Sequence, residues 1–234
     1  ARTALKPAAK PARAVTKATA RPAAKPADPL VRALKALGRA DPDLKRAIKL
    51  VGPLPDRSRA AGFATLFKVL CQQQLSVASA AAIWGRVEAA VQPLTPAQLL
   101  TFEEPALRIL GLSGQKIRYC RHLAAALAAG HLDLEALDHL DDAAALAALV
   151  QIKGIGRWTA EIYLMFAMGR PDVWPADDLA LQEAVKVLKR LKARPNQKRM
   201  DAIAEGWRPH RTTAARVLWA YYRHVKGRAG IGGT

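Results

Sequence analysis

Residues 149–185 read LVQIKGIGRWTAEIYLMFAMGRPDVWPADDLALQEAV. In this stretch, Gly154 and Gly156 form a tight turn between one predicted helix and a second predicted helix at residues 157–168. Glycine has no Cβ, so the turn allows positive φ and a close approach by another molecule's backbone. The amides after the turn begin a helix, and the N-terminus of a helix attracts anions. In a strongly basic chain, two helices joined by this turn indicate a clamp on a nucleic-acid phosphate.

A second feature of this stretch is a pair of adjacent acids, Asp177 and Asp178, which end a loop rich in Pro and Trp. An amphipathic helix is predicted directly after them, at residues 179–191. An Asp at the start of a helix is a favoured N-cap, which is the structural interpretation of Asp178. No β-strand pattern precedes the two glycines, so a dinucleotide-binding or P-loop interpretation is unsupported.

The composition predicts an all-α protein. The 234 residues suffice for one sizeable domain or two small lobes, and 51% of them are hydrophobic, which is enough for a packed core. Much of this apolar content is Ala and Leu, which favour helices, whereas runs of β-branched residues are scarce. The pattern predicts helices at residues 30–39, 43–51, 63–74, 76–91, 113–129, 141–150, 157–168, 179–191, 198–206 and 211–225.

The chain is strongly basic. It has 37 Lys and Arg residues against 19 Asp and Glu residues, a formal net charge of +18. Such a charge favours polyanionic partners, and binding that releases counterions from DNA depends on salt. A merely solubilising surface is the alternative.

The two cysteines, Cys71 and Cys120, lie far apart, and neither belongs to a Cys-x-x-Cys pair. This spacing argues against a zinc site and against a disulfide scaffold. This cysteine usage predicts a cytoplasmic protein with reduced thiols. With DNA as the expected partner, the protein is expected to be nucleoid-associated. The sequence shows neither an apolar run of membrane-spanning length nor the core of a signal peptide.

The first 28 residues are mainly Ala, Pro, Lys and Arg, with almost nothing to bury. We expect residues 1–28 to be a disordered basic tail, which either scans DNA nonspecifically or is an inert extension. Repeated prolines would break the amphipathic helix that an organelle transit peptide needs. A folded domain is expected over residues 29–226, followed by a flexible C-terminal tail at residues 227–234.

Three consecutive amides, Gln72, Gln73 and Gln74, end the helix predicted at residues 63–74. An amide donates and accepts hydrogen bonds at once, which suits the edges of nucleic-acid bases. Capping of the helix C-terminus is the alternative interpretation.

These motifs resemble the helix-hairpin-helix (HhH-GPD) superfamily of DNA glycosylases. The resemblance rests on GIGRWTA at residues 154–160 followed by PADDL at residues 175–179, on QQLS at residues 73–76, on LGLSGQK at residues 110–116 and on WRPHRTTA at residues 207–214. Within the superfamily, the chain is most similar to the alkylated-base branch, DNA-3-methyladenine glycosylase II. The hairpin alone is a weak signal, whereas the hairpin with an Asp at this distance is specific.

The resemblance covers residues 30–226 and implies a compact, all-helical, two-lobed fold with the active-site cleft between the lobes. It implies a base excision repair enzyme, a monomer that binds double-stranded DNA, flips a nucleotide and hydrolytically removes N-alkylated purines such as 3-methyladenine and 7-methylguanine. The alternatives are a glycosylase for another lesion (hypoxanthine, ethenoadenine or uracil) and a non-catalytic hairpin protein that binds damaged DNA. No membrane partner is expected.

Asp178 matches the family's catalytic Asp. Cleavage of an N-glycosidic bond builds positive charge on the sugar, and a carboxylate beside C1′ stabilises that charge or orients the attacking water. Bifunctional relatives carry a nucleophilic Lys at the position of Trp158. The resemblance therefore implies a monofunctional hydrolase without AP-lyase activity, in which Lys153 faces phosphate.

The resemblance also implies three sets of binding residues. An aromatic pocket holds a cationic base by stacking, and this base pocket is expected to contain Trp158, Trp207, Trp174 and Tyr163, with His210 where a relative has Trp. The DNA wedge is expected at Gln74, with Gln73 and Leu75 beside it. The phosphate-binding residues are expected to be Gly154, Gly156, Lys153, Arg157, Lys116 and Arg211.

By resemblance, the hairpin also binds a monovalent cation, Na+ or K+, through the main-chain carbonyls of Val150, Ile152 and Ile155. No cofactor is expected to be required. With two cysteines, the sequence lacks the four-cysteine iron–sulfur loop of other branches of the superfamily.

Overall fold

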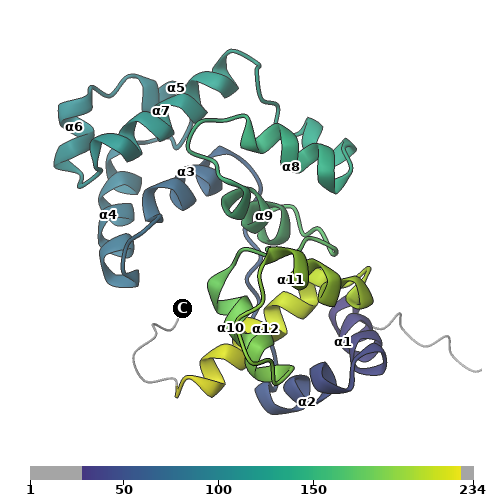
Figure 1. Ribbon diagram of the computed structural model, residues 1–234. Helices are drawn as coiled ribbons and strands as arrows, with labels where there is room; N and C mark the ends of the chain where they lie inside the picture. Colours follow the sequence, from purple (N-terminus) through teal and green to yellow (C-terminus); the bar gives the residue numbers. More distant parts are fainter. Residues whose placement is uncertain (1–27, 228–234) are drawn as a thin grey trace, which may run out of the picture.

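The computed structural model describes residues 28–227, and every regular element within them is a helix (Figure 1). The α-helices are α1 (Pro29–Ala40), α2 (Pro42–Val51), α3 (Phe63–Gln72), α4 (Val77–Ala90), α5 (Pro96–Leu100), α6 (Glu104–Ile109), α7 (Gly114–Ala128), α8 (Asp142–Val150), α9 (Arg157–Phe166), α10 (Leu179–Leu188), α11 (Gln197–Ala204) and α12 (Arg211–Val225). Two short 3-10 helices are η1 (Ala136–His139) and η2 (Glu205–Trp207). The prediction of an all-α protein is confirmed. The predicted tails fall almost entirely on residues 1–27 and 228–234, outside the described part.

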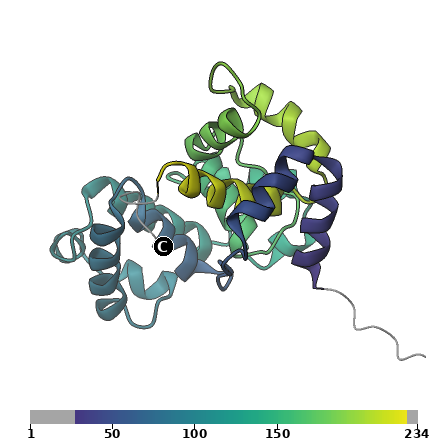
Figure 2. The same cartoon turned by 90° about the horizontal axis from the view of Figure 1, so that it is seen from below.

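The helices form two lobes (Figure 1). One lobe contains the consecutive helices α3 to α8, in which α7 packs against α3, α5 and α6. The other lobe contains α1, α2, α10, α11 and α12, and here α12 packs against α1, α2 and α10. Helices from the two ends of the described chain therefore lie side by side, as the view from below in Figure 2 shows. Helix α9 lies between the lobes and contacts α3 and α8.

Capping side chains explain where many of the helices begin. Asp28 and Asp41 each accept hydrogen bonds from first-turn backbone amides, and a proline follows each of them. Ser113 caps α7, Asp178 caps α10 and Asn196 caps α11 in the same way. These bonds satisfy amides that have no partner within the helix, and Pro at the first helical position sacrifices no such bond.

Asp41 does more than cap α2. Its buried carboxylate accepts hydrogen bonds from Nζ of Lys189, at 2.7 and 2.6 Å, and from Nε1 of Trp207, at 2.8 Å. Burial by itself would raise the pKa of Asp41, but the bonds from Lys189 and Trp207 outweigh it and lower the pKa. The three side chains fasten α2 to α10 and η2, which are distant in sequence.

Two parts of the fold differ from the expected helices. Helix α3 ends at Gln72, two residues before the predicted end, because Gln73 has extended angles (φ −53°, ψ 137°) and Gln74 has φ +55°. Helices α5 and α6 have no counterpart among the predicted helices, since five or six residues are too few to show a helical period. Within residues 28–227, no helix is both long and apolar enough to cross a membrane.

Candidate active site

The predicted Gly-x-Gly turn joins α8 to α9, which together form a helical hairpin. Gly154 has φ +103°, and a Cβ at this position would overlap Cγ of Tyr119 and lie 2.5 Å from its Cβ. The amide of Ile155 donates to the carbonyl of Ile152 at 2.9 Å and closes the turn. Gly156, the N-cap of α9, has φ −77° and open space where a Cβ would lie. The turn therefore requires glycine at Gly154 for packing, whereas Gly156 leaves the N-terminus of α9 open to an anion.

The carboxylate of Asp178 is held from three directions. Its Oδ1 accepts a hydrogen bond from the backbone amide of Leu181 at 2.8 Å and from Nε1 of Trp219 at 3.2 Å. Its Oδ2 accepts from Nε1 of Trp158 at 2.9 Å. The N-cap interpretation of Asp178 is confirmed, and the two indoles orient the carboxylate beyond what capping needs. A carboxylate held in this way stabilises a developing positive charge without having to reorient first.

Trp219, on α12, is a site residue that the sequence analysis missed. Besides donating to Asp178, its ring packs against Phe166 with a centroid distance of 5.9 Å. Trp219 lies 41 residues from Asp178 along the chain, so no local spacing connects the two. The one available signal, an aromatic residue on the last amphipathic helix, is equally typical of a core position.

Of the predicted base-pocket aromatics, Trp158 alone lies at an open surface, with 43% of its area exposed. Trp207 is 2% exposed and donates to Asp41, and Trp174 packs edge-on against it with ring centroids 5.3 Å apart. Tyr163 is 1% exposed, and its hydroxyl accepts from the amide of Gly62 at 2.8 Å. The assignment of these three residues to the base pocket is therefore wrong, because an extruded base cannot stack on rings sealed in the core.

His210 lines a different cavity from Trp158. It precedes α12 as its N-cap residue and lines a cavity of about 970 Å³ together with Phe166, Pro171 and Arg216. The walls of this cavity include neither Trp158 nor Asp178. The assignment of His210 to the base pocket therefore stays a prediction.

The predicted wedge and the hairpin line one cleft of about 860 Å³. Nε2 of Gln73 donates to the carbonyl of Gly154 at 3.3 Å and to Oγ1 of Thr159 at 3.1 Å, which joins the end of α3 to the hairpin. Gln74 and Leu75 are exposed at this cleft, and the positive φ of Gln74 turns the chain there. Trp158 lines the same cleft, so the wedge, the hairpin and the partner of Asp178 are neighbours.

Two of the predicted phosphate-binding cations remain at the surface. Lys153 is exposed in the hairpin turn. The side chain of Arg157, in the first turn of α9, is 51% exposed, although its Nε pairs with Oε1 of the buried Glu161 at 2.9 Å. Both residues flank the open N-terminus of α9, as the phosphate-binding prediction requires.

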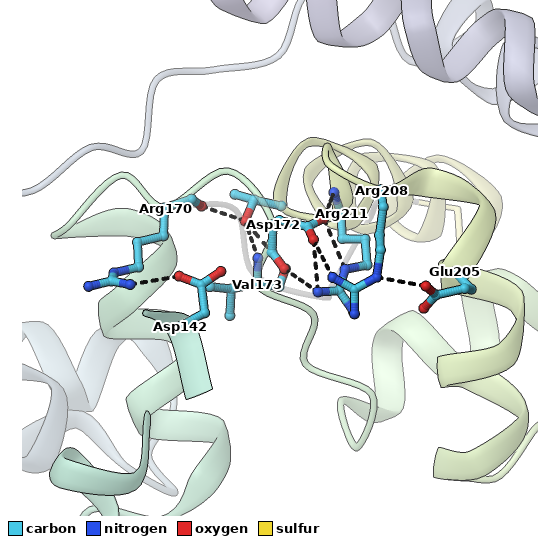
Figure 3. A network of polar contacts seen from close by, with 8 residues as sticks. Asp142, Arg170, Asp172, Val173, Glu205, Arg208 and Arg211 are labelled. Atoms are coloured by element: carbon cyan, nitrogen blue, oxygen red, sulfur yellow. Dashed lines mark hydrogen bonds and ion pairs between the residues drawn. The ribbon is translucent and has the colours of Figure 1, made fainter. Parts of the chain in front are cut away.

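The other two cations have partners within the protein. Arg211 is paired with Asp172, so its assignment to phosphate is corrected. Lys116 lines the same cleft as Gln74 and Trp158, so its assignment stays a prediction. Nζ of Lys116 donates to the carbonyl of Cys71 at 2.6 Å, and burial lowers the pKa of this ammonium. The guanidinium of Arg211 is 15% exposed and pairs with Asp172 through two nitrogens at 2.9 Å (Figure 3). Lys116 ties α7 to the end of α3, and Arg211 ties α12 to the loop after α9; both contacts stabilise the fold.

The predicted cation site lies at the hairpin turn, where the carbonyl of Ile152 accepts the amide of Ile155. A carbonyl oxygen has two lone pairs, so the carbonyl of Ile152 can accept this hydrogen bond and still bind a cation. The binding of Na+ or K+ by the carbonyls of Val150, Ile152 and Ile155 stays a prediction. Among residues 28–227, no group of three or more His, Cys, Asp or Glu side chains is placed to hold a metal ion.

Comparison with known proteins gives a consistent result. The family model of the HhH-GPD superfamily base excision DNA repair protein matches residues 67–209. DNA-3-methyladenine glycosylase 1 of Schizosaccharomyces pombe is 34% identical over 197 residues, which cover 81% of this chain and 86% of that protein. The alkylbase DNA glycosidase-like protein mag2 of the same organism is 28% identical, covering 84% of this chain and 96% of that protein.

Solved structures show the same likeness. The crystal structure of DNA-3-methyladenine glycosidase from Bacillus halodurans has a TM-score of 0.75 and 32% identity, covering 86% of this chain and 92% of that chain. The structure of S. pombe 3-methyladenine DNA glycosylase (Mag1) in complex with abasic DNA has a TM-score of 0.73 and 30% identity, covering 87% of this chain and 100% of that chain. The two-lobed helical fold is thus common to these proteins.

Proposed function

Because the chain belongs to the HhH-GPD superfamily of base excision DNA repair proteins, we propose that it is a DNA glycosylase that hydrolyses the N-glycosidic bond of alkylated purines in duplex DNA. The observation that carries this proposal is the carboxylate of Asp178, which two indoles hold. One of these indoles, Trp158, lines the cleft that the wedge and the hairpin also line. The names of the relatives support alkylated bases, with 3-methyladenine and 7-methylguanine as the substrates we expect for this chain.

DNA engagement begins at the hairpin. The amides at the open N-terminus of α9, together with Lys153 and Arg157, bind a phosphate of the lesion strand. The target nucleotide must leave the helical stack, because neither the base nor C1′ is accessible within it. Gln74, exposed at the cleft, enters the space that the flipped nucleotide vacates and pairs with the remaining base through its amide.

Bond cleavage follows from charge. An N-alkylated purine is cationic and therefore a good leaving group, and its departure leaves an oxocarbenium-like sugar. The carboxylate of Asp178 stabilises this positive charge or orients the attacking water. The exposed face of Trp158 stacks on the cationic base, where a ring gains from both dispersion and cation–π attraction.

The enzyme acts by hydrolysis alone. A lyase needs an amine that attacks C1′, and the position after Arg157 carries Trp158 instead. Neither nearby lysine stands at that position. Lys116 is half-buried and donates a hydrogen bond to the carbonyl of Cys71, and Lys153 precedes the Gly-x-Gly turn, whereas Trp158 follows it. We expect the protein to act as a monomer, with Na+ or K+ at the hairpin carbonyls assisting the phosphate clamp.

The experiment that tests the function measures base release from methylated duplex DNA by chromatography, with Asp178→Asn beside the wild type. Asn retains the N-cap but not the charge, so we expect wild-type release of 3-methyladenine or 7-methylguanine and loss of release by at least about 100-fold in the variant. Binding to abasic DNA should be retained. Asp177→Asn, which removes the exposed neighbouring carboxylate, is the matched control and should remain active.

Three outcomes would contradict the proposal in different ways. Full activity of Asp178→Asn would exclude this carboxylate from the chemistry. Absence of release from methylated DNA, with release of hypoxanthine, ethenoadenine or uracil, would change the substrate class. Strand cleavage at an abasic site by the pure protein would contradict the hydrolysis-only mechanism.

A further inference from the structure

Four arginines from two distant parts of the chain gather beside α12. Arg57 and Arg59 belong to the segment between α2 and α3, whereas Arg216 and Arg223 are on α12. Arg57 is partly buried, and its pKa is lowered first by burial and then by the positive charges of Arg223, Arg216 and Arg59. These four residues, called the arginine cluster below, are therefore close enough for their like charges to repel one another.

Two hydrogen bonds hold the segment of Arg57 and Arg59 in place. Nη2 of Arg216 donates to the carbonyl of Pro55 at 2.8 Å, which joins the segment to α12. The backbone amide of Arg59 donates to the carbonyl of Phe166 at 2.7 Å, which joins the segment to the end of α9. These bonds fix the backbone of the segment that carries Arg57 and Arg59, and the side chain of Arg216, relative to α12 and α9.

Unlike Arg208 and Arg211, the members of the arginine cluster form no ion pair with a carboxylate among the described residues. Asp172 forms ion pairs with Arg208 and Arg211 at 2.7 and 2.9 Å, and Glu205 also pairs with Arg208 (Figure 3). Within residues 28–227, by contrast, no member of the arginine cluster has a carboxylate oxygen within 4.0 Å. Asp56 interacts with the charge of Arg216 at longer range and offsets part of the positive charge of the arginine cluster. One carboxylate against four guanidinium groups leaves a net positive charge, which favours an external anion.

The arginine cluster and the hairpin lie on different sides of Asp178. On α12, Trp219 lies three residues after Arg216 and four before Arg223, so the three share one face of the helix. Trp219 bonds to Oδ1 of Asp178, whereas Trp158 of the hairpin helix bonds to Oδ2. The arginine cluster is therefore on the α12 side of the carboxylate, and the hairpin is on its α9 side.

Arg59 connects the arginine cluster with the cleft. It is exposed and lines the same cleft as Gln73, Gln74 and Trp158. An anion bound by the arginine cluster would therefore lie at the rim of the space that receives the lesion strand.

We propose that Arg57, Arg59, Arg216 and Arg223 bind a backbone phosphate of the lesion strand on the side of the flipped nucleotide opposite to the hairpin phosphate. The assignment of the lesion strand rests on the proposed function. With the hairpin at one side of Asp178 and the arginine cluster at the other, the strand is held at two points, and the nucleotide between them is presented to the carboxylate.

The test measures binding of the full chain to a duplex with a central tetrahydrofuran abasic analogue, by fluorescence anisotropy at several salt concentrations. Arg57→Gln/Arg223→Gln should bind roughly fivefold more weakly at 0.1 M salt. The slope of log K against log salt should fall by about 1 to 2. The matched control, Arg39→Gln/Lys49→Gln, removes two exposed charges from α1 and α2 outside both cavities and should leave the slope nearly unchanged.

A second measurement locates the phosphate. Neutral methylphosphonates replace the phosphates around the abasic analogue one at a time. The wild type should lose affinity at the phosphate bound by the arginine cluster, and Arg57→Gln/Arg223→Gln should be insensitive there but still sensitive at the hairpin phosphate. Arg57→Lys/Arg223→Lys, which keeps the charges, should behave like the wild type.

The proposal is overturned if the Gln variant responds to every methylphosphonate as the wild type does, or if the Lys variant behaves like the Gln variant. Thermal unfolding of each variant identifies loss of folding, and Arg223→Gln alone then replaces the double variant. The readout is DNA binding, so failure of the wild type to release alkylated bases would refute the proposed function without affecting this result.

Discussion

The carboxylate of Asp178 receives one indole N–H from α9 and another from α12. The donor on α9, Trp158, is exposed and is also the ring that we expect to stack on the base. The donor on α12, Trp219, is partly buried against Phe166. At the scale of single residues, Trp219 is thus the better probe of how orientation of the carboxylate contributes to catalysis.

Trp219→Phe keeps an aromatic ring beside Phe166 and removes the hydrogen bond to Asp178. A hydrogen bond to a charged group contributes about 1.5–3 kcal/mol, so we expect a single-turnover rate of base release lower by roughly 10-fold to 100-fold. Binding to abasic DNA should change little. In an Asp178→Asn background, the same substitution should have no further effect, and an undiminished effect there would mean that Trp219 acts independently of the carboxylate.

Glu161 is the other residue with unusual surroundings. It is 2% exposed, its Oε1 pairs with Arg157, and its Oε2 has no hydrogen-bond partner among the described residues. Burial raises the pKa of Glu161 to about 7 although the charge of Arg157 opposes this, and the charges of Asp177 and Asp201 raise it further. The folded protein therefore binds a proton at Glu161 more tightly than the unfolded chain does.

This difference predicts how stability depends on pH. Below the unfolded pKa of 4.5, Glu161 is protonated in both states and imposes no electrostatic cost. As pH rises from there through about 7, ionisation increasingly favours the unfolded chain, and the cost levels off above the folded pKa. The full cost is on the order of 3 kcal/mol.

Glu161→Gln removes this titration, so its free energy of unfolding should rise relative to that of the wild type between pH 5 and pH 8. Urea denaturation at a series of pH values measures the difference. Glu104→Gln, which removes an exposed carboxylate paired with Arg108, is the control. Parallel pH profiles for wild type and Glu161→Gln would refute the assignment.

At the scale of elements, the hairpin depends on its turn. The two glycines of the turn have different roles: Gly154 has positive φ and packs against Tyr119, whereas Gly156 has an ordinary φ and open surroundings. Nε2 of Gln73 bonds to the carbonyl of Gly154, so a displaced turn would also move the loop that carries the wedge. The hairpin and the wedge loop thus behave as one unit.

Gly154→Ala should destabilise the protein by about 3 kcal/mol or more, because it combines steric overlap with positive φ for a residue that has a Cβ. Gly156→Ala should cost within about 1 kcal/mol, the difference between Gly and Ala at an N-cap. Chemical denaturation of the two variants measures both values. Equal costs for the two substitutions would show that the contact with Tyr119 does not constrain the turn.

At the scale of the whole molecule, the two ends of the described chain close one lobe together. Asp41 accepts hydrogen bonds from Lys189 and Trp207, which lie 148 and 166 residues further along the chain. This contact holds α1 and α2 against the C-terminal helices, and α12 in turn positions Trp219 beside Asp178. The geometry around Asp178 therefore depends on a contact far from the cleft.

Asp41→Asn should lower the free energy of unfolding at pH 7 by about 3 kcal/mol, because it removes the buried charge partner of Lys189 and leaves only the more exposed Asp43. Since the folded pKa of Asp41 is lowered, its contribution is present above the unfolded pKa of 3.8 and is lost as pH falls below it. Asp43→Asn removes the more exposed partner of Lys189 and should cost less. Urea denaturation distinguishes the two, and equal losses would contradict the central role of Asp41.

The sequence by itself determined the all-helical class, most helix starts, the hairpin turn and the N-cap at Asp178. These features depend on residues close together in the chain: a cap bonds to amides two or three positions on, and a helical period repeats every three or four residues. The ends of helices were less predictable, as α3 shows, because Gln73 leaves the helix to bond with Thr159, 86 residues away.

Only the tertiary structure decided which aromatic and charged side chains face the site. From the sequence, Trp158 and Trp207 were the leading candidates and Trp174 came behind them, yet packing left Trp158 exposed and buried the other two. The positions of Trp219 and of the arginine cluster could not be predicted from the sequence, because the residues around them come from distant segments of the chain. Whether an indole is core or site, and whether an arginine is neutralised or free to bind phosphate, depends on what the folded chain brings within a few ångströms of it, and local sequence does not contain that information.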